Sequence, residues 1–194
     1  MKLKPQNTYK HLLNFASNDS ARPILTGFHV TNEGHIEATN AHILLRLFNR
    51  MPAGNEMTLH PKELQEIEGN YPDTSRLFPS SFNTTFKLLP ETAAAIGKFL
   101  KALDKKIPIT VAVSESELVI TQMPSKATQT FEVTKVDGDA MEFACQVQYL
   151  GFMMAFIADC SPITVNVGLI SPVRPVVFEV SGLFAGIVTP VRTK

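Results

Sequence analysis

The stretch SPVRPVVFEVSGLFAGIVTPVRTK, residues 171–194, carries the clearest fold signal in this chain. Residues 173–180 are rich in β-branched and aromatic side chains, a Ser-Gly pair follows, and residues 184–188 form a second apolar run. This pattern predicts two strands joined by a tight turn. Pro190 lacks the N–H of a paired strand, so the second strand ends there. The tail at residues 189–194 combines apolar residues with two cations, so it could either fray or line a groove.

Size and composition set the first limits. A chain of 194 residues can hold one large domain or two of roughly 100 residues each. The hydrophobic content of 44% and charged content of 19% are typical of a globular protein. The formal net charge is zero, which argues against bulk binding of polyanions but leaves local patches open.

The sequence also predicts a cytoplasmic protein. No apolar run approaches the roughly 20 residues needed to span a bilayer, and the N-terminus, MKLKPQNTYK, lacks the apolar core of a signal peptide. The two cysteines, Cys145 and Cys160, flank a predicted helix, about 20 Å apart at the helical rise, and are too distant to bridge. We expect both thiols to be reduced and buried.

The pattern of apolar residues and turn residues predicts the elements along the chain. In the first part we expect a helix, four strands, a short helix and a Pro- and Ser-rich connector, over residues 6–16, 22–31, 35–39, 42–48, 57–60, 61–68 and 70–81. In the second part we expect a strand, a helix, four strands, a helix and three strands, over residues 84–89, 91–103, 107–113, 117–122, 127–134, 141–145, 146–158, 163–167, 173–180 and 184–188. Residues 137–139 read as a turn.

Written as elements, the chain shows an internal repeat. The unit is strand, helix, strand, strand, strand, and it runs over residues 1–48, with a weak first strand, and again over 84–134 and 140–190. Residues 57–82 supply only the strand and helix of another copy. We therefore predict an α+β fold of repeated βαβββ units, with antiparallel sheets that carry helices on one face. The expected domains are 1–82, one full unit and a partial one, and 83–194, two units.

Four segments, in this order, carry a family resemblance: RPILTGFHVTNEGHIEATNAHILLRLF (22–48), NYPDTSRLFP (70–79), EFACQVQYLGFMMAFIADCSPITVNVG (142–168) and the closing pair SPVRPVVFE and IVTPVRT. Within the first segment, Ala-Thr-Asn-Ala-His-Ile-Leu (38–44) is similar to an Ala-Thr-Asp-Gly-His/Tyr-Arg-Leu pattern. Together these segments resemble the bacterial replicative sliding clamps, the beta-subunit family of DNA polymerase III.

The resemblance implies a DNA-clamp-like fold and a role in DNA replication. Members of that family have three domains of two units each and form rings, with helices facing duplex DNA and sheets outside. This chain resembles the second and third domains, and the second is shortened because the family has a longer helix and further strands where this chain has only residues 60–70. Asn40, Ala41 and Ile43 also replace the family's Asp, Gly and Arg.

The resemblance also implies a pocket for partner peptides between the two domains, where a motif rich in Gln, Leu and Phe would insert. Carried over position by position, the pocket residues are Leu25, Thr39, Ala41, His42, Ile43, Leu44, Pro79, Val173, Pro175, Val188, Thr189, Pro190, Val191 and Arg192. An apolar groove of this kind would bury a motif at roughly 25 cal/mol per Å², and backbone groups of the tail could bond an extended peptide. The alternative is that these residues only pack the seam between the domains.

Contact with DNA would need cations on the inward helices. Candidates with helical spacing on one face are Lys98, Lys101 and Lys105, together with Lys2, Lys4 and Lys10 near the first helix and Arg22 in a loop. Such side chains would meet phosphates without reading sequence, and their affinity would depend strongly on salt. The alternative is an ordinary solvated helix face. Residues 146–158 carry no cation, which weighs against DNA contact there.

No catalytic or metal-binding pattern is found in the sequence. The five histidines lack metal-ligand spacing, and no phosphate-binding glycine loop or nucleophile elbow occurs. We therefore expect no cofactor, no metal and no enzymatic activity.

Two functions remain open at the sequence level. One is a clamp-like processivity factor that encircles duplex DNA as a homo-oligomer and binds a DNA polymerase, a clamp loader or other proteins with the motif. The other is a non-encircling, clamp-derived interaction module that binds replication proteins or the host clamp.

Overall fold

The computed structural model describes residues 5–161 and 163–192. Its first part consists of α1 (Pro5–Phe15), a 3₁₀ turn η1 (Pro23–Thr26), β1 (Phe28–Val30), β2 (Ile36–Thr39), β3 (Ile43–Leu47), β4 (Met57–Leu59) and a 3₁₀ turn η2 (Ser75–Leu77). Its second part consists of β5 (Thr84–Leu88), α2 (Pro90–Lys101), β6 (Ile109–Ser114), β7 (Glu117–Gln122), β8 (Ala127–Glu132), β9 (Thr134–Gly138), β10 (Met141–Cys145), α3 (Val147–Cys160), β11 (Val165–Leu169), β12 (Val176–Val180) and β13 (Phe184–Val188).

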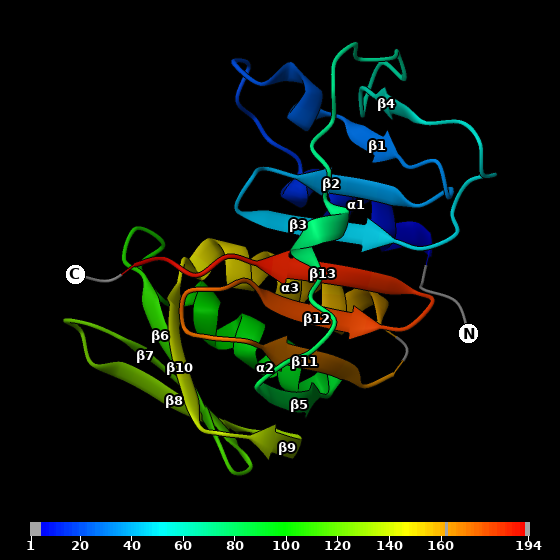
Figure 1. Cartoon of the computed structure of the whole chain (residues 1–194). Helices are drawn as coiled ribbons and strands as arrows, with labels where there is room; N and C mark the ends of the chain where they lie inside the picture. Colours follow the sequence, from blue (N-terminus) through cyan, green and yellow to red (C-terminus); the bar gives the residue numbers. More distant parts are fainter. Residues whose placement is uncertain (1–4, 162, 193–194) are drawn as a thin grey trace.

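The strands form two antiparallel sheets. One has nine strands in the order β4-β1-β2-β3-β13-β12-β11-β5-β9, and the other has four in the order β10-β6-β7-β8. The large sheet is continuous across the chain because β3 pairs with β13, with Leu45 opposite Gly186 and Ile43 opposite Val188. Strands from the two ends of the sequence are therefore neighbours, as Figure 1 shows.

The helices lie on one face of the large sheet, behind the strands in Figure 1. Alternation along the strands turns apolar side chains toward these helices. The main apolar core results, and it includes Phe15 of α1, Leu45 of β3, Phe156 of α3 and Phe184 of β13. The α+β architecture with antiparallel sheets and helices on one face is confirmed.

Helix α3 occupies the centre of this core. Its apolar side chains almost surround the helix, as expected for a helix covered on several sides, and Met153, Phe156 and Ile157 are fully buried. The helix approaches β13 closely at Gly186, where an added Cβ would lie 2.3 Å from the Met153 Cε atom. Glycine at this position therefore lets the helix pack directly on the strand.

Two expectations for the first part of the chain are wrong. Residues 22–26 do not extend the first strand, because Pro23 starts the turn η1. Residues 61–68 do not form a helix. Instead the chain reverses at Leu64, whose φ is +55°, and returns along β4, where the His60 N–H donates to the Gln65 carbonyl (2.8 Å) and the Ile67 N–H to the Thr58 carbonyl (2.7 Å). Backbone hydrogen bonds to the unpaired edge of β4 stabilise this short segment more than the few hydrogen bonds of an isolated helical turn would.

One expectation for the second part also needs correction. Residues 137–139 were expected to form a turn, but 137 and 138 belong to β9, which pairs with β5. Strand β5 supplies backbone hydrogen-bond partners for these residues, and their turn-like composition, Asp-Gly-Asp, does not indicate this pairing. Both cysteines are free and buried as expected, and burial raises the pKa of the Cys145 thiol to about 12.

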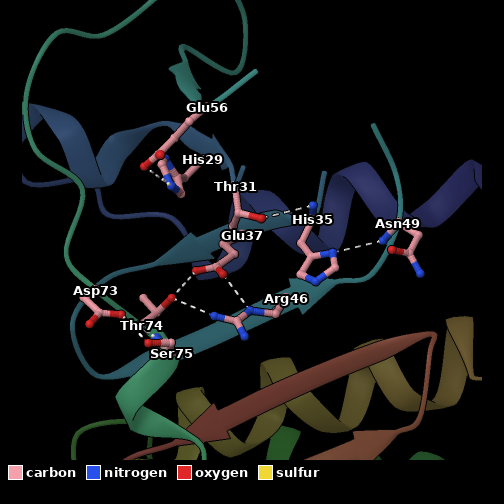
Figure 2. Close-up of polar contacts among 10 residues, drawn as sticks. All are labelled: His29, Thr31, His35, Glu37, Arg46, Asn49, Glu56, Asp73, Thr74 and Ser75. Carbon is pink, nitrogen blue, oxygen red and sulfur yellow. Dashed lines mark hydrogen bonds and ion pairs between the residues drawn. The ribbon is translucent and has the colours of Figure 1, made fainter. Parts of the chain in front are cut away.

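The connector between the two parts is fixed to the outer face of the large sheet by a buried polar network (Figure 2). The Glu37 side chain is fully buried, and its Oε1 atom accepts a 2.6 Å hydrogen bond from Arg46 Nε. The Thr74 hydroxyl donates to Glu37 Oε2 (2.6 Å) and accepts from Arg46 Nη2 (2.9 Å). Further along, Phe78 and Phe82 pack on Leu44, Val177 and Ile187 of the sheet.

Candidate functional site

The turn between β2 and β3 stands at the end of the seam where β3 pairs with β13. The Asn40 Oδ1 atom accepts hydrogen bonds from the backbone N–H groups of His42 (2.9 Å) and Ile43 (3.0 Å). The Thr39 hydroxyl accepts from the Ala41 N–H (3.1 Å), and Ala41 has a φ of +74°. These contacts hold the turn in one conformation, with Ala41 and His42 exposed.

The C-terminal tail docks beside this turn. The Thr189 N–H donates to the His42 carbonyl (2.9 Å), and the Val191 N–H donates to the Ala144 carbonyl of β10 (2.8 Å). Residues 189–192 therefore run from the turn to the edge of the small sheet. The described part of the tail is bound to its neighbours rather than frayed.

Helix α3 supplies the third wall. The His42 ring stacks on the Tyr149 ring, with centroids 5.6 Å apart and planes 14° from parallel. Tyr149 lies in the first turn of α3 and is half-buried. The turn, the tail and α3 thus meet around one histidine.

A cavity opens on each side of the turn. One, of about 490 Å³, is lined by Leu13, Asn14, Ala16, Ser17, Asn18, Asp19, Arg22, Asn40, His42, Gln148, Tyr149 and Phe152. The other, of about 480 Å³, is lined by Ala21, Arg22, Pro23, Ile24, Leu25, Ala41, Glu68, Gly69 and Pro72. We call these two cavities, together with the turn at 40–42, the seam site.

The seam site combines apolar walls with polar groups of both signs. Leu13 and Phe152 line the first cavity and Ile24 and Leu25 the second, while the Arg22 side chain borders both. Such a surface can bind an extended chain through apolar side chains and peptide groups. Among the residues the structure describes, no group of three or more His, Cys, Asp or Glu could hold a metal ion.

Only some of the expected peptide-pocket residues line the seam site. Leu25 and Ala41 line one cavity, and His42 lines the other. Thr39 lies beneath the turn, where its hydroxyl donates to the Ile43 carbonyl (2.6 Å).

The remaining expected residues lie around the site without lining either cavity. Ile43, Leu44 and Val188 are buried within the sheet, and Leu44 is covered by Phe78 and Phe82. Pro79 follows on the connector and is half-buried. The tail residues and their approach have mixed exposure: half-buried Pro175, Thr189, Pro190 and Val191, and exposed Val173 and Arg192.

Sequence reasoning missed the contribution of α3. Gln148, Tyr149 and Phe152 border the first cavity, but the helix over residues 146–158 was considered only for the cations that DNA contact would need. A signal was present: Gln148 is the polar residue of the first helical turn, and Phe152 follows it at the spacing of one face. Asn40 was also missed, because its role in shaping the turn depends on backbone geometry.

The expected DNA-binding cations divide into three groups. Lys98, Lys101 and Lys105 lie together along a groove of about 480 Å³ between α2 and α3, and Lys10 is exposed on α1. Arg22 lies at the seam site instead. Lys2 and Lys4 are outside the described residues.

His11 of α1 does not join these cations at the surface. It is buried, and its Nε2 atom lies 3.1 Å from Asp159 Oδ2 of α3. Burial lowers the pKa of His11, although Asp159 opposes this shift. His11 therefore links α1 to α3.

None of the described helices is long and apolar enough to cross a bilayer.

Comparison with solved structures identifies the fold. The sliding clamp of Bacillus subtilis matches with a TM-score of 0.80 and 16% identity, over all of this chain and 64% of the clamp. The DNA polymerase beta subunit of Streptococcus pyogenes matches with a TM-score of 0.76 and 19% identity, over all of this chain and 68% of that one. A Bartonella birtlesii clamp bound to griselimycin matches with a TM-score of 0.75 and 15% identity, over 95% of this chain and 63% of that one.

The sequence matches no protein-family model and no curated protein. The likeness is therefore one of structure, at 15–20% identity among the clamps compared. The chain spans less than two thirds of the length of several of these clamps. Over that length, this chain has the fold of the bacterial DNA polymerase III beta sliding clamps.

Proposed function

We propose that this chain is a clamp-like, non-enzymatic replication protein that binds short apolar motifs of partner proteins at the seam site and lies against duplex DNA with its helices. The observation that carries this proposal is the convergence of three segments on His42: its own turn, the tail through Thr189, and α3 through Tyr149. In the clamp fold, such a preorganised surface costs little conformational entropy when a peptide binds. Partners would be a DNA polymerase, a clamp loader or another protein carrying the motif.

The DNA part of the proposal rests on the helical face. Lys98, Lys101 and Lys105 gather along one groove, and Lys10 is exposed on the neighbouring helix α1. Cations in this arrangement would contact phosphates and read no sequence. Because the described cations here are few and the net charge is zero, we expect weak binding that is lost as salt rises.

Peptide binding is tested with a fluorescent peptide that carries Gln, Leu and Phe. We expect Tyr149→Ala and Val191→Asp each to weaken binding at least about tenfold, because the first removes a wall of the site and the second places a charge on the tail. Leu64→Ser, which changes an exposed side chain elsewhere, serves as the matched control. If both seam variants bind the peptide as tightly as the control, the seam site is not the binding surface.

A second candidate is the non-encircling module, and one observation favours it. A head-to-tail ring joins unlike surfaces of successive copies, and in the clamp fold the ends of the sheets are natural places for such joints. In this chain residues 65–67 occupy the outer edge of β4 through the Gln65 and Ile67 backbone hydrogen bonds. That end of the sheet is therefore not free to pair with another copy.

The two candidates differ in topology on DNA. A ring that encircles DNA stays on a closed circle at high salt and slides off after the circle is cut. A non-encircling protein dissociates from both forms alike. Retention on closed circular DNA, lost on linearisation, would establish the ring; equal loss from both would establish the module.

A further inference from the structure

A row of polar side chains crosses the outer face of the large sheet, beneath the connector. Thr58 of β4 lies opposite His29 of β1, which lies opposite Glu37 of β2. Arg46 of β3 continues the row as the partner of Glu37. Thr58, His29 and Glu37 are all buried, because the connector covers this part of the sheet face that the helices leave open (Figure 2).

His29 is the titratable group of this row that the connector covers directly. Its Nδ1 atom lies 3.0 Å from the Thr58 Oγ1 atom, and its Nε2 atom lies 3.6 Å from Glu56 Oε1. The ring of Tyr71, on the connector, stacks on the imidazole ring, with centroids 4.1 Å apart and planes 4° from parallel. His29 is only 7% exposed as a result. Tyr71 is therefore the group that must move before water reaches this face of the histidine.

The segment that carries Tyr71 is held to the sheet by side chains. Among the backbone hydrogen bonds of the described residues, none involves residues 68–73, whereas Ile67 just before them bonds to Thr58 of β4. Thr74 just after them joins the Glu37 network. A segment with so few backbone bonds opens at low free-energy cost. Residues 68–73 can therefore leave the sheet face without separating any pair of strands.

The same segment forms one wall of the seam site. Glu68, Gly69 and Pro72 line its second cavity, together with residues of η1 and of the turn between β2 and β3. Pro72 follows Tyr71 directly in the sequence. The position of this wall therefore depends on the stack between Tyr71 and His29, although His29 does not line the cavity itself.

A proton on His29 opposes the docking of this segment. Burial lowers the pKa of His29, Glu37 and Glu56 oppose that shift, and Arg46 adds to it. The two carboxylates do not reverse the shift, because Glu37 is already bonded to Arg46 and Glu56 is 64% exposed, so that water screens its charge. The imidazolium is hydrated once Tyr71 has left the ring, so protonation and undocking favour each other.

From these contacts we propose that His29 regulates the seam site by proton binding: neutral His29 holds residues 68–73 on the sheet through Tyr71, and protonated His29 releases them, which removes one wall of the second cavity. The docked segment is favoured above the ordinary titration range of histidine and is released progressively as pH falls below about 6.5. Release of the segment stands on the contacts of His29 alone, whereas its effect on partner binding rests on the proposed function.

The first experiment measures release of the segment without any peptide. With 3-fluorotyrosine in place of its three tyrosines, the intact chain gives a fluorine signal for Tyr71, and its broadening by a soluble paramagnetic compound reports exposure. We expect this broadening to grow at least about twofold from about pH 7.5 to about pH 5.5. His29→Gln should abolish the growth, and His11→Gln, a buried histidine bonded to α3 instead, should keep it. Unchanged exposure of Tyr71, or an equal gain for Tyr149 that indicates general unfolding, would overturn the proposal.

The second experiment measures the effect on the seam site with the fluorescent peptide that carries Gln, Leu and Phe. Over the same pH range, we expect its dissociation constant to rise at least about threefold more for the wild type than for His29→Gln. Tyr71→Leu, which removes the stack but keeps the histidine, should bind weakly already at about pH 7.5 and share the smaller pH dependence.

The outcomes of this second experiment separate the two proposals. His11→Gln should show the pH dependence of the wild type. Equal pH dependence in the wild type and His29→Gln would overturn the regulation of the seam site by His29. A peptide that binds at neither pH would contradict the proposed function, while the fluorine signal of Tyr71 still decides whether residues 68–73 are released.

Discussion

At the scale of single residues, the buried carboxylate of Glu37 constrains several elements at once. A charge with no exposed side-chain surface must be matched by hydrogen bonds, and Arg46 and Thr74 both bond to it. Arg46 also lies over the Phe78 ring, with its Cζ atom 4.7 Å from the ring centroid. One carboxylate thereby fixes two strands and the connector that crosses them.

Replacing Thr74 with Val should therefore destabilise the protein out of proportion to the change in size. The variant keeps the shape but leaves one Glu37 oxygen and one Arg46 N–H without their partner, at a cost of about 1–3 kcal/mol. Urea unfolding of the variant measures this loss. Ser75→Ala, an exposed hydroxyl beside it, is the control; equal stability of the two variants would contradict the role of the network.

Two buried histidines predict a loss of stability in mild acid. Burial lowers the pKa of His11 and of His29 below the ordinary histidine value, despite the opposing effects of Asp159 on His11 and of Glu37 and Glu56 on His29. The unfolded chain therefore binds protons at pH values where the folded chain does not, and stability falls as pH drops below about 6.5. The free energy of unfolding, measured from about pH 7.5 to about pH 5.5, should decline, and the double variant His11→Gln with His29→Gln should flatten that decline. An equally steep decline in the variant would show that other groups are responsible.

At the scale of elements, the long periodic segments could be predicted from sequence and the short ones could not. The sequence placed the helices α1, α2 and α3 and the strands of the C-terminal stretch to within a few residues. These elements bury one face, so their apolar residues recur at the spacing of a helix or a strand. Residues 61–68 were wrongly predicted because their composition suits a helix, whereas the outcome was decided by backbone hydrogen bonds to β4, the strand directly before them. The seam site follows the same rule: Ala41 and His42 belong to a motif, whereas Tyr149 reaches the site through the packing of α3.

Leu64 gives a direct test of that correction. Its φ of +55° is unfavourable for a residue with a Cβ, and its side chain is 71% exposed. Leu64→Gly should raise the free energy of unfolding by about 0.5–1 kcal/mol if the chain reverses here. In a helix the same change would lower it by about 1 kcal/mol. Ala95→Gly in the exposed part of α2 supplies that helical reference.

At the scale of the whole molecule, the two predicted domains share one sheet and one apolar core, which the sequence does not reveal. The boundary near residue 82 follows the repeat, but β3 of the first part pairs with β13 of the second, and the main apolar core contains residues of both. A repeat count shows which elements form a unit, whereas pairing between units depends on edges that meet only in the folded chain.

We therefore expect the chain to unfold in one cooperative transition. Native-state amide hydrogen exchange should give the same opening free energy for β2 and for β11, which lie on opposite sides of the β3–β13 seam. A difference of more than about 2 kcal/mol between the two strands would indicate two units that open separately. Gly186→Val, which would drive a side chain into Met153 at the seam, should lower both values together.

The pairing of β3 with β13 also has a consequence for biosynthesis. During translation β3 emerges well before its neighbour β13, so the nascent chain exposes the apolar residues Ile43, Leu45 and Leu47 until β13 has been made. Contacts between the two ends of a sequence form slowly, and unpaired apolar strands tend to aggregate meanwhile. Ribosome-bound chains that stop before residue 184 should recruit chaperones, and chains that include β13 should recruit fewer.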